Sequence, residues 1–127
     1  MSINGKMAMD NFEFGEKLKK RTKAFAVQIV KFYKNLRTDE ARVIGRQGLR
    51  SGTSIAANYR AVCRAKSSAD FISKMGTVVE ETDETLLWLK LFEEAGILPA
   101  AALKLLKQES DELLRIFSRS LSSARHS

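Results

Sequence analysis

The scarcity of proline constrains the fold of this chain most strongly. Pro99 is the only proline among 127 residues, and no segment combines apolar and polar alternation with the turn signals of a β-sheet. Apolar residues instead recur every three or four positions in four long segments, as they do in amphipathic helices. The sequence therefore predicts an all-α protein, an antiparallel up-and-down four-helix bundle that forms one domain over residues 1–127.

The expected helices cover residues 14–36, 39–64, 68–95 and 99–122. Thr38 or Asp39 can cap the second helix, because short polar side chains accept hydrogen bonds from the first turn. Gly96 suits the end of the third helix, and Pro99 suits the start of the fourth. The last residues, 123–127, are expected to fray.

Net charge points toward an anionic partner. Lysine and arginine total 22 against 15 acidic residues, a formal charge of +7, and residues 1–66 carry +10 while residues 67–127 carry −3. Such a basic balance favours nucleic acid or an anionic surface, although an ordinary basic protein has the same composition. The asymmetry also allows the basic half of one subunit to meet the acidic half of another.

The compartment is predicted from the single cysteine and from the absence of targeting patterns. Cys63 cannot form an intramolecular disulfide, which is compatible with a reducing environment. Residues 1–11 lack the features of a signal peptide, and no later stretch is an uncharged membrane span. We therefore expect a cytoplasmic protein with no membrane partner.

The side chains needed for most catalytic sites are scarce. His126, the only histidine, lies in the expected tail, so a histidine base, a Ser-His-Asp triad and a histidine-rich metal site are all disfavoured. The acidic cluster of Glu80, Glu81, Asp83 and Glu84 lacks the accompanying histidines of a di-iron site, and a solvated or ion-pairing face explains it. We expect no catalytic residue, no metal and no cofactor.

Five arginines fall on one side of the second expected helix. They are Arg42, Arg46, Arg50, Arg60 and Arg64. At 100° per residue they lie within about 80° of one another, along about 33 Å of helix. This arginine stripe can contact phosphates with little sequence discrimination, supported by Lys17, Lys20 and Lys31 of the first helix. Alternatively, the arginines pair with acidic side chains inside the bundle or across subunits.

Three glycines share the second expected helix with the stripe. Gly45, Gly48 and Gly52 follow no strand and match no complete nucleotide-binding motif. Each glycine lowers the stability of a helix by about 1 kcal/mol relative to alanine, so packing against a neighbour is the expected reason for their presence. We expect close approach of a neighbouring helix on that side.

Two features depart from the simple bundle pattern. Arg21 falls within the apolar stripe of the first helix, which makes it a candidate for a buried ion pair, while a ligand or partner contact is the functional alternative. Convergence of Arg21 with Glu81 or Glu84 around an open cavity would indicate an enzyme.

The second departure is an apolar surface near the end of the third helix. Leu87, Trp88 and Leu91 lie on the side that carries Glu80 and Glu84, where a monomeric helix is normally polar. A subunit interface anchored by Trp88 is the first interpretation, and packing against helices on both flanks is the second.

A family resemblance is carried by strings in the second and third expected helices. They are Arg42–Gly45, Leu49–Arg60, Arg64–Ala65 and Asp70–Lys74, extended by Arg21–Thr22, Phe25–Ala26 and Trp88–Leu89. Over residues 12–120 the chain thereby resembles the bacterial four-helix-bundle family of 23S rRNA intervening-sequence proteins. The chain departs from the usual pattern at Gly48, where a larger apolar residue is common, and at Ala61, where an acid is common.

The resemblance implies a cytoplasmic four-helix bundle encoded in an insertion within a ribosomal RNA gene or elsewhere in a bacterial genome. The family is also similar to the accessory variability protein of diversity-generating retroelements, a homopentamer that binds nucleic acid and a reverse transcriptase. By that likeness we expect a homopentamer, with a reverse transcriptase or another protein as a possible partner.

The residues and the resemblance together give one leading hypothesis. It is a non-enzymatic oligomeric scaffold that binds RNA, or nucleic acid generally, through the arginine stripe. The alternative is a protein-interaction adaptor that has no physiological nucleic-acid ligand.

Overall fold

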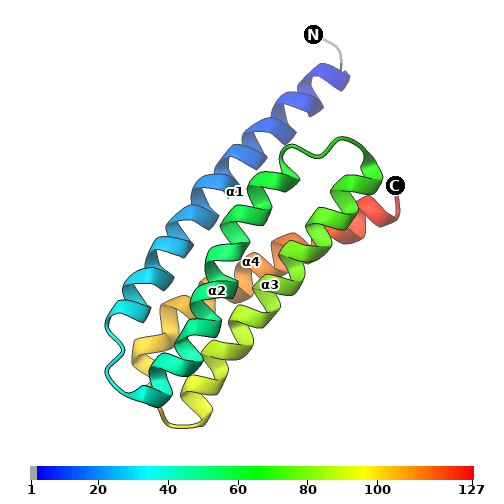
Figure 1. The fold of residues 1–127 in the computed structure, drawn as a ribbon. Coiled ribbons are helices and arrows are strands. Elements are labelled where there is room, and N and C mark those ends of the chain that lie inside the picture. Colours follow the sequence, from blue (N-terminus) through cyan, green and yellow to red (C-terminus); the bar gives the residue numbers. More distant parts are fainter. Residues whose placement is uncertain (1–2) are drawn as a thin grey trace.

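The protein is an antiparallel bundle of four helices in a computed structural model, which describes residues 3–127 and the side chains from residue 11 onward (Figure 1). The helices are α1 (Ile3–Lys34), α2 (Asp39–Val62), α3 (Ser68–Glu94) and α4 (Ala100–Arg125). Short connections reverse the chain direction after each helix, and no strand occurs within residues 3–127. The expected all-α, up-and-down bundle is confirmed.

Local sequence signals set the ends of the helices. The Thr38 hydroxyl accepts a hydrogen bond from the Ala41 amide at 3.2 Å, and Ser67 does the same for Asp70 at 3.0 Å. After α3 the backbone turns at Gly96, whose φ of +69° is unfavourable for other residues. The caps therefore lie where short polar residues and glycine allow the chain to start or stop.

Several helix ends differ from the boundaries expected from the sequence, and three of the differences concern the start of α1 and the ends of α2 and α4. α1 begins at Ile3 rather than at residue 14, and its first turns extend beyond the connection between α2 and α3 (Figure 1). The sequence prediction started this helix at Phe14, the first residue of the apolar repeat from which it was read. α4 continues to Arg125 through residues expected to fray, and α2 ends at Val62, two residues before Arg64.

The core consists of two adjoining apolar clusters. The larger surrounds Phe117, whose ring lies 5.4 Å from that of Tyr59, and the smaller surrounds Phe92, whose ring meets Phe32 edge-on at 5.6 Å. Leu106 packs against both clusters. One continuous apolar interior therefore runs along the bundle.

The four helices pack unequally around this core. α2 packs closely against both α1 and α3, and α3 packs closely against α4, whereas α1 and α4 touch only loosely. The loose seam is a groove of about 470 Å³ lined by residues of both helices, including Phe25, Lys31 and Leu105. Within residues 3–127, α1 and α3 lie diagonally across the bundle without close contact.

The hydrocarbon core of a lipid bilayer requires a helix that is both long and almost uniformly apolar. Among the described residues, none of the four helices has this combination of length and apolar character.

Candidate nucleic-acid interface

The outer face of α2 carries four of the five arginines of the stripe. Asp39 and Glu40 occupy the first turn of this helix, where negative charge stabilises the N-terminus. The apolar and small residues of α2 turn inward and are buried; they are Ala41, Gly45, Ser51, Gly52, Ile55, Tyr59 and Val62. Burial of that face fixes the rotation of α2, so Arg42, Arg46, Arg50 and Arg60 lie on the exposed side of the helix.

Two arginines of the stripe are available for a ligand. Arg46 and Arg60 are exposed, and neither forms an ion pair with an acidic side chain within residues 11–127. They are separated by fourteen residues, or about 21 Å along the helix. Their guanidinium groups can therefore meet phosphates at two well-separated points.

The ends of the stripe are arranged differently. Arg42 is exposed, and its Nε donates a 3.3 Å hydrogen bond to the carbonyl of Leu36 in the connection after α1. Arg64 lies beyond the end of α2, where its amide donates to the carbonyl of Ala61 at 3.0 Å. The helical part of the stripe therefore runs from Arg42 to Arg60, about 27 Å, shorter than the sequence indicates.

Arg50 is committed to α3. Its guanidinium donates to Glu81 Oε2 at 3.2 Å and to Glu84 Oε1, so one side chain bridges two carboxylates across the α2 and α3 seam. The hydrogen bond from Arg50 lowers the pKa of Glu84, with a smaller contribution from Trp88. Arg50 therefore forms an ion pair within the chain, as in the second interpretation of the arginine stripe, and it is less available to phosphates.

The lowered pKa of Glu84 predicts an acid-sensitive contribution to stability. Arg50→Gln should lower the free energy of unfolding by about 0.2–1 kcal/mol near neutral pH, because the pair is partly exposed. A carboxyl group with a depressed pKa stabilises the fold above its unfolded pKa of about 4.3. That contribution is lost as the pH falls through the lower folded value.

Urea unfolding of wild type and Arg50→Gln across this pH range measures the effect. The difference between them should shrink toward zero as the pH falls, whereas Arg60→Gln, which removes no ion pair within residues 11–127, should show no such trend. A difference that is constant with pH would contradict the assigned pair.

Arg21 pairs with α4 rather than with α3. Its Nε and one terminal nitrogen donate to the two oxygens of Glu109 at 2.8 and 2.7 Å, and Glu112 lies 2.9 Å away. The side chain of Arg21 is 31% exposed, so the pair is partly solvated rather than fully buried. Arg21 does not converge with Glu81 or Glu84, because those two carboxylates pair with Arg50.

The sequence contains only part of the information that is needed to find the acidic partners of Arg21. Glu109 and Glu112 are three residues apart and therefore share one side of α4. The sequence alone does not give the register of α4 against α1, so the choice among acids needs the structure.

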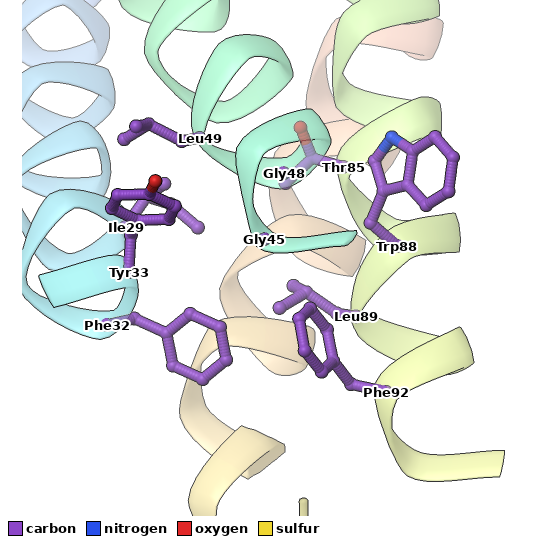
Figure 2. A pocket seen from close by; sticks show the side chains of 10 residues that line it. All are labelled: Ile29, Phe32, Tyr33, Gly45, Gly48, Leu49, Thr85, Trp88, Leu89 and Phe92. Atoms are coloured by element: carbon purple, nitrogen blue, oxygen red, sulfur yellow. The ribbon is translucent and has the colours of Figure 1, made fainter. Parts of the chain in front are cut away.

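The glycines of α2 allow close approach of α1, as expected from the sequence. A Cβ at Gly52 would lie 2.9 Å from Ile29 Cγ1, and a Cβ at Gly45 would collide with Leu36. Gly48 instead faces α3, where a Cβ would lie 3.8 Å from that of Trp88. The small space beside these residues is about 10 Å³, room for at most one water molecule, so it offers no ligand site (Figure 2).

Trp88 is held by contacts within its own chain. Figure 2 shows it beside Gly48 and Thr85, and its indole nitrogen donates to Glu84 Oε1 at 3.3 Å. Leu91 is half-buried, whereas Leu87 is 50% exposed and points away from the core. Of the three residues assigned to a subunit interface, Leu87 is the most accessible and Trp88 already has intrachain partners.

The lysines of α1 do not extend the arginine stripe. Lys31 lines the groove between α1 and α4, and Lys17 and Lys20 fall on the same side of α1 at 100° per residue. That side faces away from α2. All three are exposed, and together they form a second basic surface.

Among the residues whose side chains are described, no three histidine, cysteine or acidic residues are placed to hold one ion. Cys63 is exposed, and burial of part of its surface raises the pKa of its thiol.

Comparison with known proteins identifies the family. Residues 16–119 match the family described as 23S rRNA-intervening sequence protein. A crystal structure of a protein of unknown function from the S23 ribosomal protein family of Bacteroides thetaiotaomicron shares 35% sequence identity and superposes with a TM-score of 0.75. The match covers 81% of this chain and 96% of that one. None of the curated proteins matches the sequence. This chain belongs to the family of 23S rRNA-intervening sequence proteins.

Proposed function

We propose that this protein is a non-enzymatic, cytoplasmic scaffold that assembles as an oligomer and binds RNA through the outer face of α2. The observation that carries the proposal is the exposure of Arg46 and Arg60 without an acidic partner in residues 11–127, on one side of a helix that the core holds in place. Arg42 adds a third guanidinium to this surface.

The chemistry of these side chains favours phosphate contacts. A guanidinium group presents a planar set of donors that matches two phosphate oxygens and remains charged at any physiological pH. The arginines lie on a long bundle helix and not on a short recognition helix that could enter a groove. Binding should therefore depend strongly on salt and weakly on base sequence.

The family supports RNA as the first ligand to test. Its description refers to sequences that interrupt 23S rRNA, which makes a structured ribosomal RNA fragment a suitable probe. A homopentamer is the preferred assembly, from the likeness to the accessory variability protein of retroelements.

Reversal of two free arginines should weaken RNA binding. Arg46→Glu/Arg60→Glu should raise the dissociation constant for a structured RNA at least about tenfold, equivalent to ~1.4 kcal/mol. It should also reduce the steepness of the salt dependence by about 0.7–0.9 for each phosphate that the variant no longer neutralises. Filter binding across a salt series measures both quantities.

The matched control reverses two exposed basic residues elsewhere. Lys104→Glu/Arg119→Glu on α4 changes the net charge by the same amount and should bind nearly as tightly as wild type. Arg50 is left intact because a glutamate there would face Glu81 and Glu84. Equal losses of affinity in both variants would show that RNA binding depends only on net charge. Equal affinity of wild type and both variants would show that α2 is not part of the binding surface.

Capture experiments with and without nuclease separate the proposal from a protein adaptor. A protein partner bridged by RNA should be lost after digestion. Retention of the same partner, a reverse transcriptase for example, after complete digestion would favour the adaptor.

A further inference from the structure

Exposed apolar side chains occur on all four helices, and those of α1 and α3 lie on outer faces that differ in charge. On α1, Val27 and Val30 are 43% and 46% exposed, and on α3, Leu87 is 50% exposed beside the half-buried Leu91. The flanking charges are basic on α1 and mainly acidic on α3, where the exposed Lys90 borders the face. An apolar centre with a charged rim is the usual composition of a protein interface.

The two faces have nearly the same spacing. The α1 face consists of Lys20, Lys23, Val27, Val30 and Lys34, and the α3 face consists of Glu80, Asp83, Leu87, Leu91 and Glu94. Counted from the first residue, charges stand at positions 0, 3 and 14 in both, and apolar residues at 7 and 10 or 11. Each set falls within about 80° of its helix and spans about 21 Å.

The charges of both faces are unpartnered in the single chain. None of these six lysine and acidic side chains forms an ion pair within residues 11–127, and all six are exposed. The faces cannot meet within one molecule, because α1 and α3 lie diagonally across the bundle and these faces point outward on opposite sides.

We propose that the α1 face of one copy packs against the α3 face of a second copy, with the two helices parallel. In this register Val27 meets Leu87 and Val30 meets Leu91. Lysines then oppose acids at the three flanking positions, Lys20 with Glu80, Lys23 with Asp83, and Lys34 with Glu94. The inference rests on the oligomeric part of the proposed function and is independent of RNA binding.

The direction of the helices makes this contact self-consistent. α1 and α3 run the same way in the bundle (Figure 1), so a parallel contact keeps the helix axes of all copies pointing in the same direction. The contact is heterologous, since it joins two different faces. Its repetition generates a ring when the rotation closes and an open filament when it does not. Pairing of like faces would place lysine against lysine or acid against acid, which disfavours a two-fold dimer through either face.

Charge exchange between the faces tests the contact. Wild type should have a mass several times the monomer mass of 14.2 kDa in light scattering after size exclusion. Lys20→Glu/Lys23→Glu alone and Glu80→Lys/Asp83→Lys alone should each lower the mass toward the monomer, because like charges then oppose. All four substitutions in one chain restore opposite charges without changing the net charge, and should restore the wild-type mass.

A second pair of variants separates this surface from the region around Trp88. Leu87→Asp should yield monomer, whereas Trp88→Ala should keep the assembly, since Trp88 packs on Gly48 and lies outside both faces. Far-UV circular dichroism and thermal unfolding establish that each variant is folded. Dissociation by Trp88→Ala with an intact Leu87→Asp oligomer would overturn the proposal.

The remaining outcomes also decide the question. A monomeric wild type, an unaffected mass after either single-face reversal, or no recovery in the folded four-residue exchange would each overturn the contact. Arg46→Glu/Arg60→Glu should keep the wild-type mass while it loses RNA. The proposed contact between copies would therefore remain valid even if the protein did not bind RNA, and the two proposals can be tested separately.

Discussion

Phe117→Ala should lower the free energy of unfolding by about 3–5 kcal/mol. Phe117 is fully buried in the larger core cluster, and its ring packs on that of Tyr59. Truncation removes buried apolar surface, leaves a cavity between helices and eliminates the aromatic pair. Domains are stable by only about 5–15 kcal/mol, so this loss is a large share of the total.

Urea unfolding followed by circular dichroism measures the loss, and Leu105→Ala is the matched control. Leu105 is 78% exposed, so its truncation should change stability by less than about 0.5 kcal/mol. Similar unfolding midpoints for the two variants would contradict the assignment of Phe117 to the core.

Gly52→Ala and Gly76→Ala should differ in stability by about 1–3 kcal/mol, with the first less stable. Both glycines are inside helices, so alanine brings the same gain of about 1 kcal/mol in helix propensity at each. A Cβ at Gly52 would lie 2.9 and 3.0 Å from the two γ carbons of buried Ile29, whereas a Cβ at Gly76 meets nothing within 4 Å. The difference therefore isolates the close approach of α1 to α2.

Thermal and urea unfolding of the two glycine variants test this close approach. Gly76→Ala should be at least as stable as wild type. Equal stabilisation of both variants would show that Ile29 yields at little cost, and that the glycine is not required for packing.

The sequence was sufficient for the helices and for the rotation of α2. Periodicity located all four helices because each buries a continuous apolar face, and the small residues opposite the arginines identified the buried side of α2. The start of α1 was missed because the prediction followed the apolar repeat from Phe14 onward. The separation of Arg64 from the stripe was missed because the exact end of a helix is weakly encoded.

Pairing between distant residues could not be predicted from the sequence. Arg21 was identified as a candidate for an ion pair, but its choice of Glu109 depends on the register between α1 and α4. The same holds for Arg50. An arginine that binds phosphate and one that pairs with a carboxylate look alike in the sequence, and only the structure shows that Glu81 lies within reach of Arg50. The lysines of α1 were assigned to the stripe without knowledge of the helix rotation, which places Lys31 in the groove beside α4.

The diagonal placement of α1 and α3 has a consequence for how a long polyanion would be held. α2 and α4 lie on opposite sides of the line that joins α1 to α3. In a ring built through the α1 and α3 faces, the α2 helices of all copies therefore occupy the same wall, outer or inner. A single RNA strand that follows this wall meets an arginine pair on each copy in turn, and each contact raises the local concentration for the next. Modest attraction at one subunit would then give tight, avidity-based retention of long RNA and only weak binding of short fragments.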